Sequence, residues 1–255
     1  SVANGKITRH TPFKEVYIPS AGHDAGISMG AAYWVHHQQA AQQRSAAVFN
    51  ACTGSQYSNE EIIAVCKELN LSYKQVDEAT LFDYVATRLT EGKVVGWFNG
   101  RAEFGPRALG GRSILADPRR EDAKELLNLK IKRRESFRPF APSILKEQVK
   151  DWFELDEPVP FMEKVFPIRK EKQAQIPAVT HADGSGRLQT VDKEVSERYY
   201  KLIAAFYQQT QVPILLNTSF NENEPIVNAP EEAIRCYLRT DMDMLVMQNI
   251  ILERN

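Results

Sequence analysis

Hydrophobic and polar residues follow one another along the chain with spacings that predict helices and strands in turn. Residues 58–61, Ser-Asn-Glu-Glu, have a capping-box-like pattern, and the apolar positions after them predict a helix. A strand at 72–76, a helix at 79–91 and a strand at 93–98 follow. The last strand contains Val-Val-Gly-Trp-Phe, an apolar run typical of the centre of a sheet. This order predicts an α/β fold, in the mixed α+β sense.

The N-terminal residues predict a turn, a short strand at 16–18, a glycine-rich loop at 20–30 and a helix from about 27 to 43. A strand, a glycine-rich loop and a helix N-terminus together form a common cradle for anions or nucleotides, although the signal is weak by itself. Asp24 lies in this loop. It is compatible with a metal ligand, a ribose contact or a helix N-cap, and its spacing favours the N-cap.

A short connecting segment at 46–54 follows, so we predict two domains, residues 1–45 and residues 46–255. The second domain continues with helices and strands around an irregular, proline-rich excursion at 151–178. We find no internal repeat and no low-complexity tract. The further elements predicted are helices at 118–132, 194–210 and 231–238, and strands at 176–181, 184–191, 213–216 and 244–252.

Positive charge is concentrated between Arg101 and Pro142. This stretch holds eleven Lys or Arg against six Asp or Glu, about +5, whereas the whole chain carries −1. Glycine and proline fix turns, and a guanidinium offers planar donors that suit phosphate or carboxylate, so the pattern indicates an anion pocket. A solvated basic helix is the alternative. The arginines beside Gly, Pro or aromatic residues are Arg101, Arg107, Arg112, Arg134 and Arg138.

The end of this stretch and two later segments add to this picture. The run Phe137–Pro142 cannot continue a helix, so Lys132, Arg134 and Arg138 are expected on a bend. Arg187 follows a glycine turn. Residues 217–221, Asn-Thr-Ser-Phe-Asn, come directly after a strand that we expect to be buried and parallel, where open α/β sheets bind ligands. A local turn that satisfies its own backbone is an equally good interpretation of that segment.

Several chemistries are not supported by the sequence. Cys52, Cys66 and Cys236 form no CxxC pair, and the five histidines have no HxxxH or HExxH spacing. There is no GxSxG elbow and no Walker sequence. The near-neutral total charge makes nucleic acid an improbable partner. We find no membrane span or signal peptide, and we expect a cytoplasmic protein. Arginines, a lysine, Ser and Asn together favour positioning and charge stabilisation of phosphates.

The segment Gly100-Arg-Ala-Glu-Phe-Gly-Pro-Arg-Ala-Leu-Gly110, followed by Arg112-Ser-Ile-Leu-Ala-Asp-Pro-Arg119, closely resembles the signature of the NodU/CmcH carbamoyltransferase family. Further blocks match in order and cover essentially the whole chain. They are Lys132 with Arg134, Phe137–Pro142, Pro177–His181, Gly186–Val191 and Asn217–Asn221.

The resemblance implies a YrdC-like twisted open sheet with flanking helices in residues 46–255, preceded in residues 1–45 by a remnant of an actin-like-ATPase domain. It implies that ATP, with Mg²⁺, and carbamoyl phosphate give carbamoyl-adenylate in the YrdC-like domain. The other domain, mostly missing here, passes the carbamoyl group to a substrate hydroxyl and holds Fe²⁺ or another divalent metal.

Site residues follow from the resemblance by position. Lys132 and Arg134 resemble the KxR pair of the family, and Ser219 with Asn221 its SxN counterpart. The implied catalytic residues are Lys132, Arg138, Arg187 and Ser219. The implied substrate and ATP ligands are Arg107, Arg112, Arg134, Asn217, Asn221 and Thr180.

Asp24 resembles a metal ligand whose histidine partners lie upstream, and His36 and His37 do not match them, so we expect an incomplete metal site and no complete transfer. We therefore expect the carbamoyl-adenylate half-reaction of an O-carbamoyltransferase. The alternatives are a non-catalytic nucleotide- or RNA-binding module and a degenerate scaffold. A homodimer is possible, and the acceptor substrate is not readable from these residues.

Overall fold

The computed structural model describes residues 1–39, 43 and 46–254. The predicted N-terminal helix is α2 (Gly26–Gln39). Its expected continuation to 43 crosses residues outside the described ranges, and the predicted boundary between residues 45 and 46 also falls at such a gap. The division into two domains stays a prediction.

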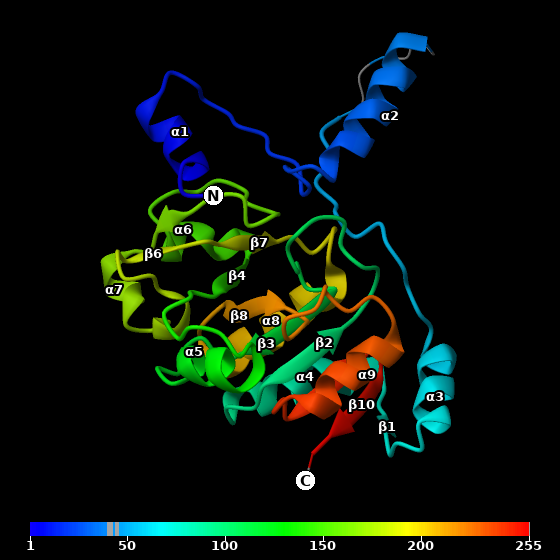
Figure 1. Cartoon of the computed structure of the whole chain (residues 1–255). Coiled ribbons are helices and arrows are strands. Elements are labelled where there is room, and N and C mark those ends of the chain that lie inside the picture. Colours follow the sequence, from blue (N-terminus) through cyan, green and yellow to red (C-terminus); the bar gives the residue numbers. More distant parts are fainter. Residues whose placement is uncertain (40–42, 44–45, 255) are drawn as a thin grey trace.

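An eight-stranded mixed sheet forms the centre of the protein, in the order β1-β10-β9-β2-β3-β8-β4-β7 (Figure 1). Strands β2 and β9 pair in parallel, as do β4 and β7, while the other neighbours are antiparallel. A two-stranded sheet joins β5 to β6. The strands are β1 (Lys74–Gln75), β2 (Val95–Phe98), β3 (Arg112–Ala116), β4 (Ala141–Leu145), β5 (Phe166–Pro167), β6 (Ser185–Gly186), β7 (Gln189–Val191), β8 (Ile214–Ser219), β9 (Met244–Met247) and β10 (Ile250–Glu253).

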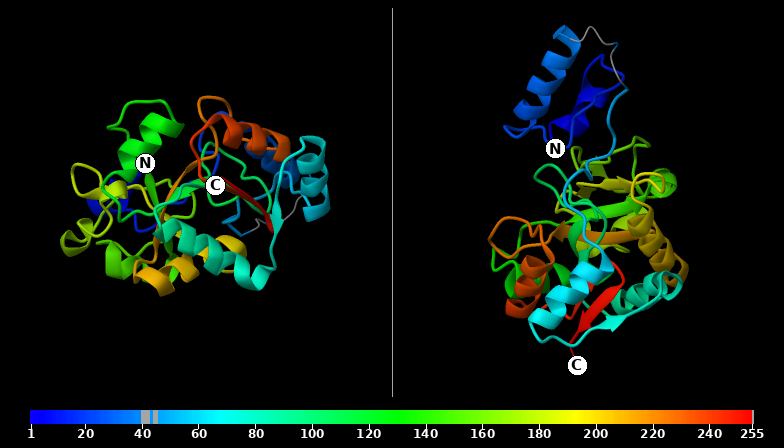
Figure 2. Two further views of the ribbon diagram at one scale, coloured as in Figure 1. Left: turned by 90° about the horizontal axis from the view of Figure 1, so that it is seen from below. Right: turned by 90° about the vertical axis from the view of Figure 1, so that its right-hand side faces the viewer.

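Helices cover both faces of this sheet (Figure 2). Helices α4 and α8 lie on one face, and α5 and α9 lie on the other. The mixed α/β class predicted from the sequence is therefore confirmed. The α-helices of this part are α3 (Asn59–Glu68), α4 (Glu78–Thr90), α5 (Ala123–Leu126), α6 (Val149–Trp152), α7 (Lys170–Gln173), α8 (Glu197–Thr210) and α9 (Pro230–Arg239). Shorter turns are the π-helix Leu127–Ile131 and the 3-10 helices Lys146–Gln148 and Pro177–Val179.

The predicted capping box at the start of α3 is confirmed in detail. The Ser58 hydroxyl accepts a hydrogen bond from the backbone N–H of Glu61 at 3.2 Å, and the Glu61 carboxylate accepts one from the N–H of Ser58 at 2.7 Å. Two of the N–H groups that a helix start leaves unpaired are thereby satisfied.

The N-terminal segment contacts the rest of the chain through its first helix and the residues before it. Helix α1 (Asn4–His10) rests on a loop, where the Asn4 side chain donates to the carbonyl of Glu163 at 2.9 Å. Helix α2 projects from the body in Figures 1 and 2 and buries none of its residues. No helix among the described residues is long and apolar enough to cross a membrane.

Two predicted elements differ from the observed backbone between residues 118 and 181. The helix expected at 118–132 begins only at Ala123 and passes into the π-helix Leu127–Ile131. The strand expected at 176–181 is instead a 3-10 turn, because Pro177 occupies its first position and cannot donate to a strand ladder.

The C-terminal strands also correct the prediction. Strand β8 is antiparallel to both of its neighbours, whereas we expected a parallel strand. The single strand expected at 244–252 is the hairpin β9–β10, which turns at Gln248 with φ of 50°. Residues 16–18, expected as a strand, lie in no strand of the structure.

Gly110 is required by the loop before β3. Its φ is +105°, and a Cβ there would lie 2.2 Å from Cδ1 of the buried Tyr199 ring. We expect Gly110→Ala to lower the free energy of unfolding by roughly 2 kcal/mol or more, through strain and overlap. Gly30→Ala is the control, because nothing lies within 4 Å of its Cβ position. Denaturant titration of both variants checks this, and equal stabilities would contradict it.

Candidate active site

A cavity of about 380 Å³ lies where segments far apart in the sequence meet at the end of β8. Four arginines contribute to its wall, and none of its described lining residues is Asp or Glu. Ser219 and Asn217 come from β8, and Pro106 and Ala108 come from the loop before β3. The arginines are Arg107, Arg134, Arg138 and Arg187. The structure therefore brings together six of the side chains that we assigned to the site from the sequence.

The positive charge of this cavity is poorly neutralised by the protein. Among the described residues, neither Arg107 nor Arg187 has a carboxylate within ion-pair distance. Burial, followed by repulsion from Arg107 and Arg134, lowers the pKa of Arg187 to about 10. A largely buried charge beside like charges and without a carboxylate partner, as at Arg187, is costly, and a bound anion would offset that cost. The arrangement is suited to binding phosphate groups.

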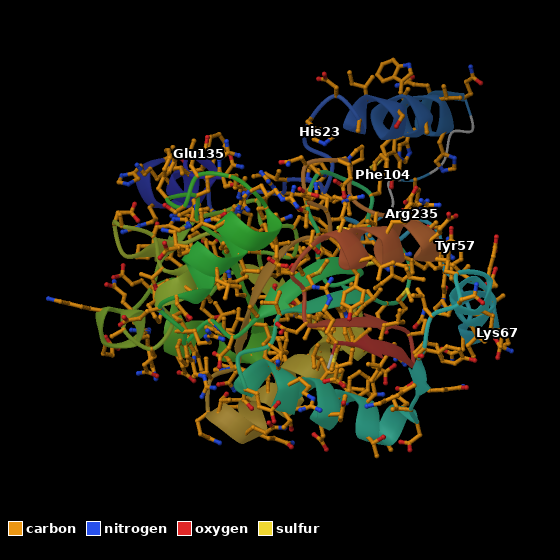
Figure 3. All side chains as sticks on the ribbon, turned by 60° about the horizontal axis from the view of Figure 1, so that its bottom comes forward. His23, Tyr57, Lys67, Phe104, Glu135 and Arg235 are labelled. Carbon is orange, nitrogen blue, oxygen red and sulfur yellow. The ribbon has the colours of Figure 1, made fainter. Side chains whose placement is uncertain are left out.

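A buried asparagine positions the arginine bend. Asn128 lies in the π-helix, and its carbonyl oxygen accepts from Nε of Arg134 at 2.7 Å. Its amide donates to the backbone carbonyls of Ser136 and Arg138, at 3.1 and 3.0 Å. Arg138 also pairs with Glu135, a surface residue in Figure 3. Because one side chain binds both ends of the bend, Arg134 and Arg138 are directed to the same cavity.

Glu103 fixes the backbone of the loop that carries Arg107. One of its carboxylate oxygens, Oε1, accepts from the backbone N–H groups of Leu109 and Gly111 at 2.6 Å each, and of Arg112 at 3.2 Å. A carboxylate bound by three N–H groups is strongly held. This contact closes the loop and presents Arg107 at its tip to the cavity.

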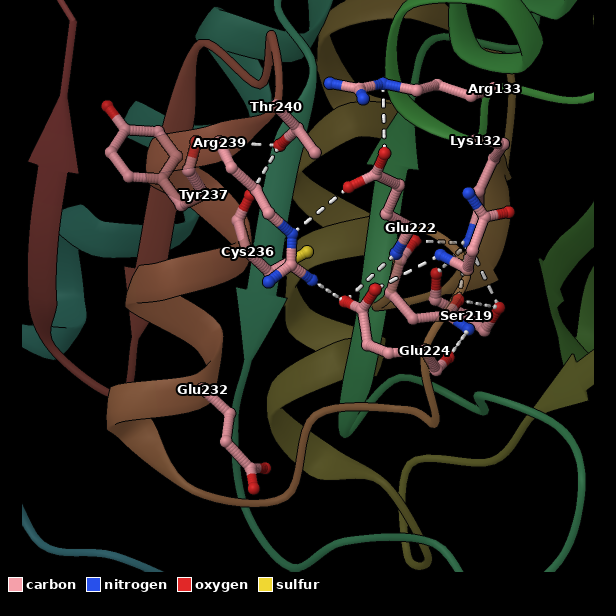
Figure 4. A network of polar contacts seen from close by, with 12 residues as sticks. Lys132, Arg133, Ser219, Glu222, Glu224, Glu232, Cys236, Tyr237, Arg239 and Thr240 are labelled. Carbon is pink, nitrogen blue, oxygen red and sulfur yellow. Dashed lines mark hydrogen bonds and ion pairs between the residues drawn. The ribbon is translucent and has the colours of Figure 1, made fainter.

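Lys132 lies behind the cavity wall and binds the turn after β8. Its Nζ donates to the carbonyl and hydroxyl oxygens of Ser219, at 2.5 and 3.1 Å, and to the carbonyl and side-chain oxygens of Asn221, at 2.8 and 2.7 Å (Figure 4). Ser219 in turn donates to Oδ1 of Asn221 at 2.7 Å. Burial, and then repulsion from Arg134, lowers the pKa of Lys132 to about 7. In this arrangement, Lys132 orients Ser219.

An ion-pair network next to Lys132 fixes the same turn from the other side. Glu222 binds Arg133 at 2.9 Å and Arg239 of α9 at 3.1 Å, and Arg239 also pairs with Glu224 (Figure 4). The amide of Asn221 donates to the Glu224 carbonyl at 2.5 Å. The segment that follows the π-helix, the turn after β8 and helix α9 are therefore joined at one point.

Arg112 is located differently from the other predicted anion ligands. It is fully buried on β3, and its guanidinium donates to backbone carbonyls, including those of Gly111 at 3.0 Å and Ser55 at 3.0 Å. It also stacks on the Phe98 ring, with 3.6 Å from Cζ to the ring centroid. Its guanidinium donates to carbonyls inside the protein, because Arg112 lies on strand β3 and not in the loop before it. It does not line the cavity.

Three other predicted residues also lie outside the cavity wall. The Thr180 hydroxyl donates to the carbonyl of Ile176 at 2.9 Å, while its neighbour His181 lines the cavity. Asn221 accepts a hydrogen bond from Ser219 and, unlike Ser219, does not line the cavity. Asp24 is exposed just before α2, and the described residues contain no group of three or more His, Cys, Asp or Glu placed to hold a metal.

The sequence analysis did not single out Glu103, Asn128, Gln189 or Glu222. A signal was available for Glu103, since a carboxylate followed by Gly105, Gly110 and Gly111 can collect the N–H groups of the folded-back loop. No such signal was available for Asn128, because an asparagine within a predicted helix is commonly a surface residue.

The chain belongs to the carbamoyltransferase family, because residues 86–254 match the family model described as "Carbamoyltransferase C-terminus". Relatives include nodulation protein NolNO of Sinorhizobium fredii, 42% identical over 98% of this chain, and nodulation protein NolO of Bradyrhizobium diazoefficiens, 40% identical over 98%. An uncharacterised protein of Synechocystis is 45% identical over 99%.

The chain spans less than half the length of each of these relatives. It covers 38% of NolNO, 47% of NolO and 46% of the Synechocystis protein. Among solved structures, full-length HypF in its phosphate- and nucleotide-bound form is similar with a TM-score of 0.47 and 19% identity. The match covers 72% of this chain and 23% of HypF.

The lowered pKa of Lys132 predicts that anion binding is coupled to proton uptake. An anion in the cavity favours the charged amine, so sulfate binding at pH 8 should take up protons, about 0.4 for a rise of one pKa unit. Arg187 remains charged at this pH, and His181, whose burial lowers its pKa below 6.5, remains neutral. Sulfate itself does not titrate there. Calorimetry in two buffers of different ionisation enthalpy measures the uptake.

The variant Lys132→Met should abolish most of this uptake. Lys146→Met is the matched control, because Lys146 is exposed and already paired with Asp192 at 2.5 Å. Unchanged uptake in Lys132→Met would show that another group titrates.

Proposed function

We propose that this chain catalyses the activation of carbamoyl phosphate with ATP, which forms carbamoyl-adenylate as the first half-reaction of an O-carbamoyltransferase. The observation that carries the proposal is a cavity whose described lining residues include four arginines and no carboxylate, in a chain of the carbamoyltransferase family. Both substrates are polyanions that repel each other in water. Fixed guanidinium groups lower that repulsion and position the reacting atoms.

The reaction balances with one water molecule. Water cleaves carbamoyl phosphate to carbamate and phosphate, and a carbamate oxygen then attacks the α-phosphorus of ATP. The bond to the β-phosphate breaks, and pyrophosphate leaves with its electron pair. The charge that develops on both leaving groups is the charge that Arg107, Arg134, Arg138 and Arg187 are placed to stabilise.

Lys132 and Asn221 act in this proposal as positioning residues for Ser219, which lines the cavity. Because the described lining residues include no carboxylate, Mg²⁺ would be carried mainly by the ATP phosphates. The cation would offset the phosphate charge there. A second divalent metal, such as Fe²⁺ near Asp24, would need ligands that the described residues do not gather.

Transfer of the carbamoyl group to a hydroxyl is proposed for the whole protein and not for these residues alone. The relatives are about twice as long as this chain or longer. We propose that their additional length supplies the acceptor site, and that residues 1–45 belong to that domain.

The test is release of pyrophosphate from ATP on addition of carbamoyl phosphate. Arg187→Ala should lower kcat/KM for this release about 100-fold, because one stabilising donor set is removed from the cavity. Arg235→Ala is the matched control, since Arg235 lies on the outer face of α9 and pairs with Glu231 at 2.6 Å (Figure 3). Its rate should stay near that of the unmodified chain.

Two outcomes would count against the proposal. Equal rates for the Arg187 and Arg235 variants would place the chemistry elsewhere. Binding of anions or RNA that weakens steeply with salt, without any pyrophosphate release, would instead support a non-catalytic binding module.

A further inference from the structure

One residue of the cavity wall, Asn217, carries a hydrogen-bond acceptor, whereas the guanidinium groups of the cavity only donate. Asn217 is 1% exposed, and its Oδ1 has no hydrogen-bond partner among the described residues. A buried carbonyl oxygen without a donor is unfavourable, so its presence calls for a physical reason. Asn217 is one of the residues that line the cavity.

The orientation of the amide is fixed by its other half. Nδ2 of Asn217 lies 3.2 Å from the carbonyl of Ala108 and 3.0 Å from Oε1 of Gln189. The Gln189 amide is itself oriented, because its Nε2 donates to the carbonyl of Leu109 at 2.8 Å. Rotating the Asn217 amide by 180° would bring its oxygen against two other acceptors. Oδ1 is therefore the atom left without a partner.

The buried hydroxyl of Ser143 completes this network. It donates to Oε1 of Gln189 at 2.7 Å and accepts from Nδ2 of Asn217 at 3.0 Å. The three side chains lie on adjacent strands β4, β7 and β8 and are almost completely buried. Such a satisfied network holds the Asn217 amide rigidly and resists its reorientation.

The ligand group that complements Oδ1 must donate a hydrogen bond. The guanidinium groups of the cavity donate to phosphate, and phosphate oxygens offer no donor in return. An amino group on the carbon of an acyl phosphate meets this requirement. A methyl group of similar size does not, since it cannot donate.

We propose that Oδ1 of Asn217 accepts an N–H hydrogen bond from the carbamoyl group and thereby selects carbamoyl phosphate over acyl phosphates such as acetyl phosphate. This inference rests on the proposed function and adds a specificity-determining residue to it. Asn217 and Ser219 point to the same face of β8, because side chains two residues apart share a face. The carbamoyl group bound by Asn217 would then lie next to the hydroxyl of Ser219.

The experiment compares pyrophosphate release with carbamoyl phosphate and with acetyl phosphate. The readout is the ratio of the two kcat/KM values, which cancels effects on stability and on phosphate binding because both donors carry the same phosphate. In Asn217→Ser, whose side chain is too short to reach the donor, the preference for carbamoyl phosphate should fall about 10-fold, the value of one hydrogen bond.

Two further variants separate recognition from a structural effect. Asn217→Asp keeps an acceptor oxygen in the Oδ1 position, although its second oxygen faces the Ala108 carbonyl and Oε1 of Gln189 and should lower stability and the affinity for both donors. Its ratio should nevertheless stay within about threefold of that of the unmodified chain. Ser143→Ala removes one partner of Nδ2 and leaves Oδ1 in place. Its ratio should stay within about twofold.

The outcomes distinguish this inference from the proposed function. If carbamoyl phosphate supports pyrophosphate release but Asn217→Ser keeps the full preference, the inference is wrong and the proposed function stands. The same holds if the unmodified chain does not prefer carbamoyl phosphate. A changed preference between ATP and ITP in Asn217→Ser, with the donor ratio unchanged, would assign Oδ1 to the adenine amino group instead. If neither donor supports release, both proposals fail.

Discussion

Repulsion among four guanidinium groups is the constraint on which the rest of the site depends. Arg107, Arg134, Arg138 and Arg187 face one cavity whose described lining residues provide no carboxylate. Arg187 is held beside Arg107 and Arg134 without a carboxylate partner, and burial, followed by repulsion from these two arginines, lowers its pKa to about 10. The cost of this repulsion is offset only when an anion occupies the cavity, which favours polyanionic substrates over the empty state.

Three side chains behind the cavity wall hold the arginine-bearing loops and the turn after β8 in place. Glu103 closes one loop with a single carboxylate oxygen, and Asn128 ties the arginine bend to the π-helix. Lys132 binds the turn after β8 through four oxygen atoms. None of these three side chains lines the cavity, so they fix the backbone around it and leave the cavity wall to the arginines. Preorganisation of this kind is what lets fixed charges stabilise a reaction.

The strand order explains why such distant residues meet. Strand β8 lies between β3 and β4, so the loop before β3 and the bend before β4 both end beside the turn that follows β8. These connections supply Arg107, Arg138 and Ser219 in one place. The antiparallel direction of β8 is essential to this, because it brings its C-terminal end to the edge where β3 and β4 begin. The parallel strand that we expected would have had to place the same polar residues at a different edge.

The sequence by itself determined the mixed α/β class and the start of α3, because apolar runs and capping patterns are local signals. The six assigned residues that line the cavity were indicated by motif blocks that resemble the carbamoyltransferase family and, for the arginines, by Gly, Pro or aromatic neighbours. It could not determine that Arg112 faces inward to backbone carbonyls, or that Thr180 and Lys132 lie behind the wall. Nor could it show that the amide of Asn217 keeps an acceptor without a partner. Only the tertiary structure decided these points, since the direction of a side chain and the pairing of its polar atoms depend on neighbours that are distant in the sequence.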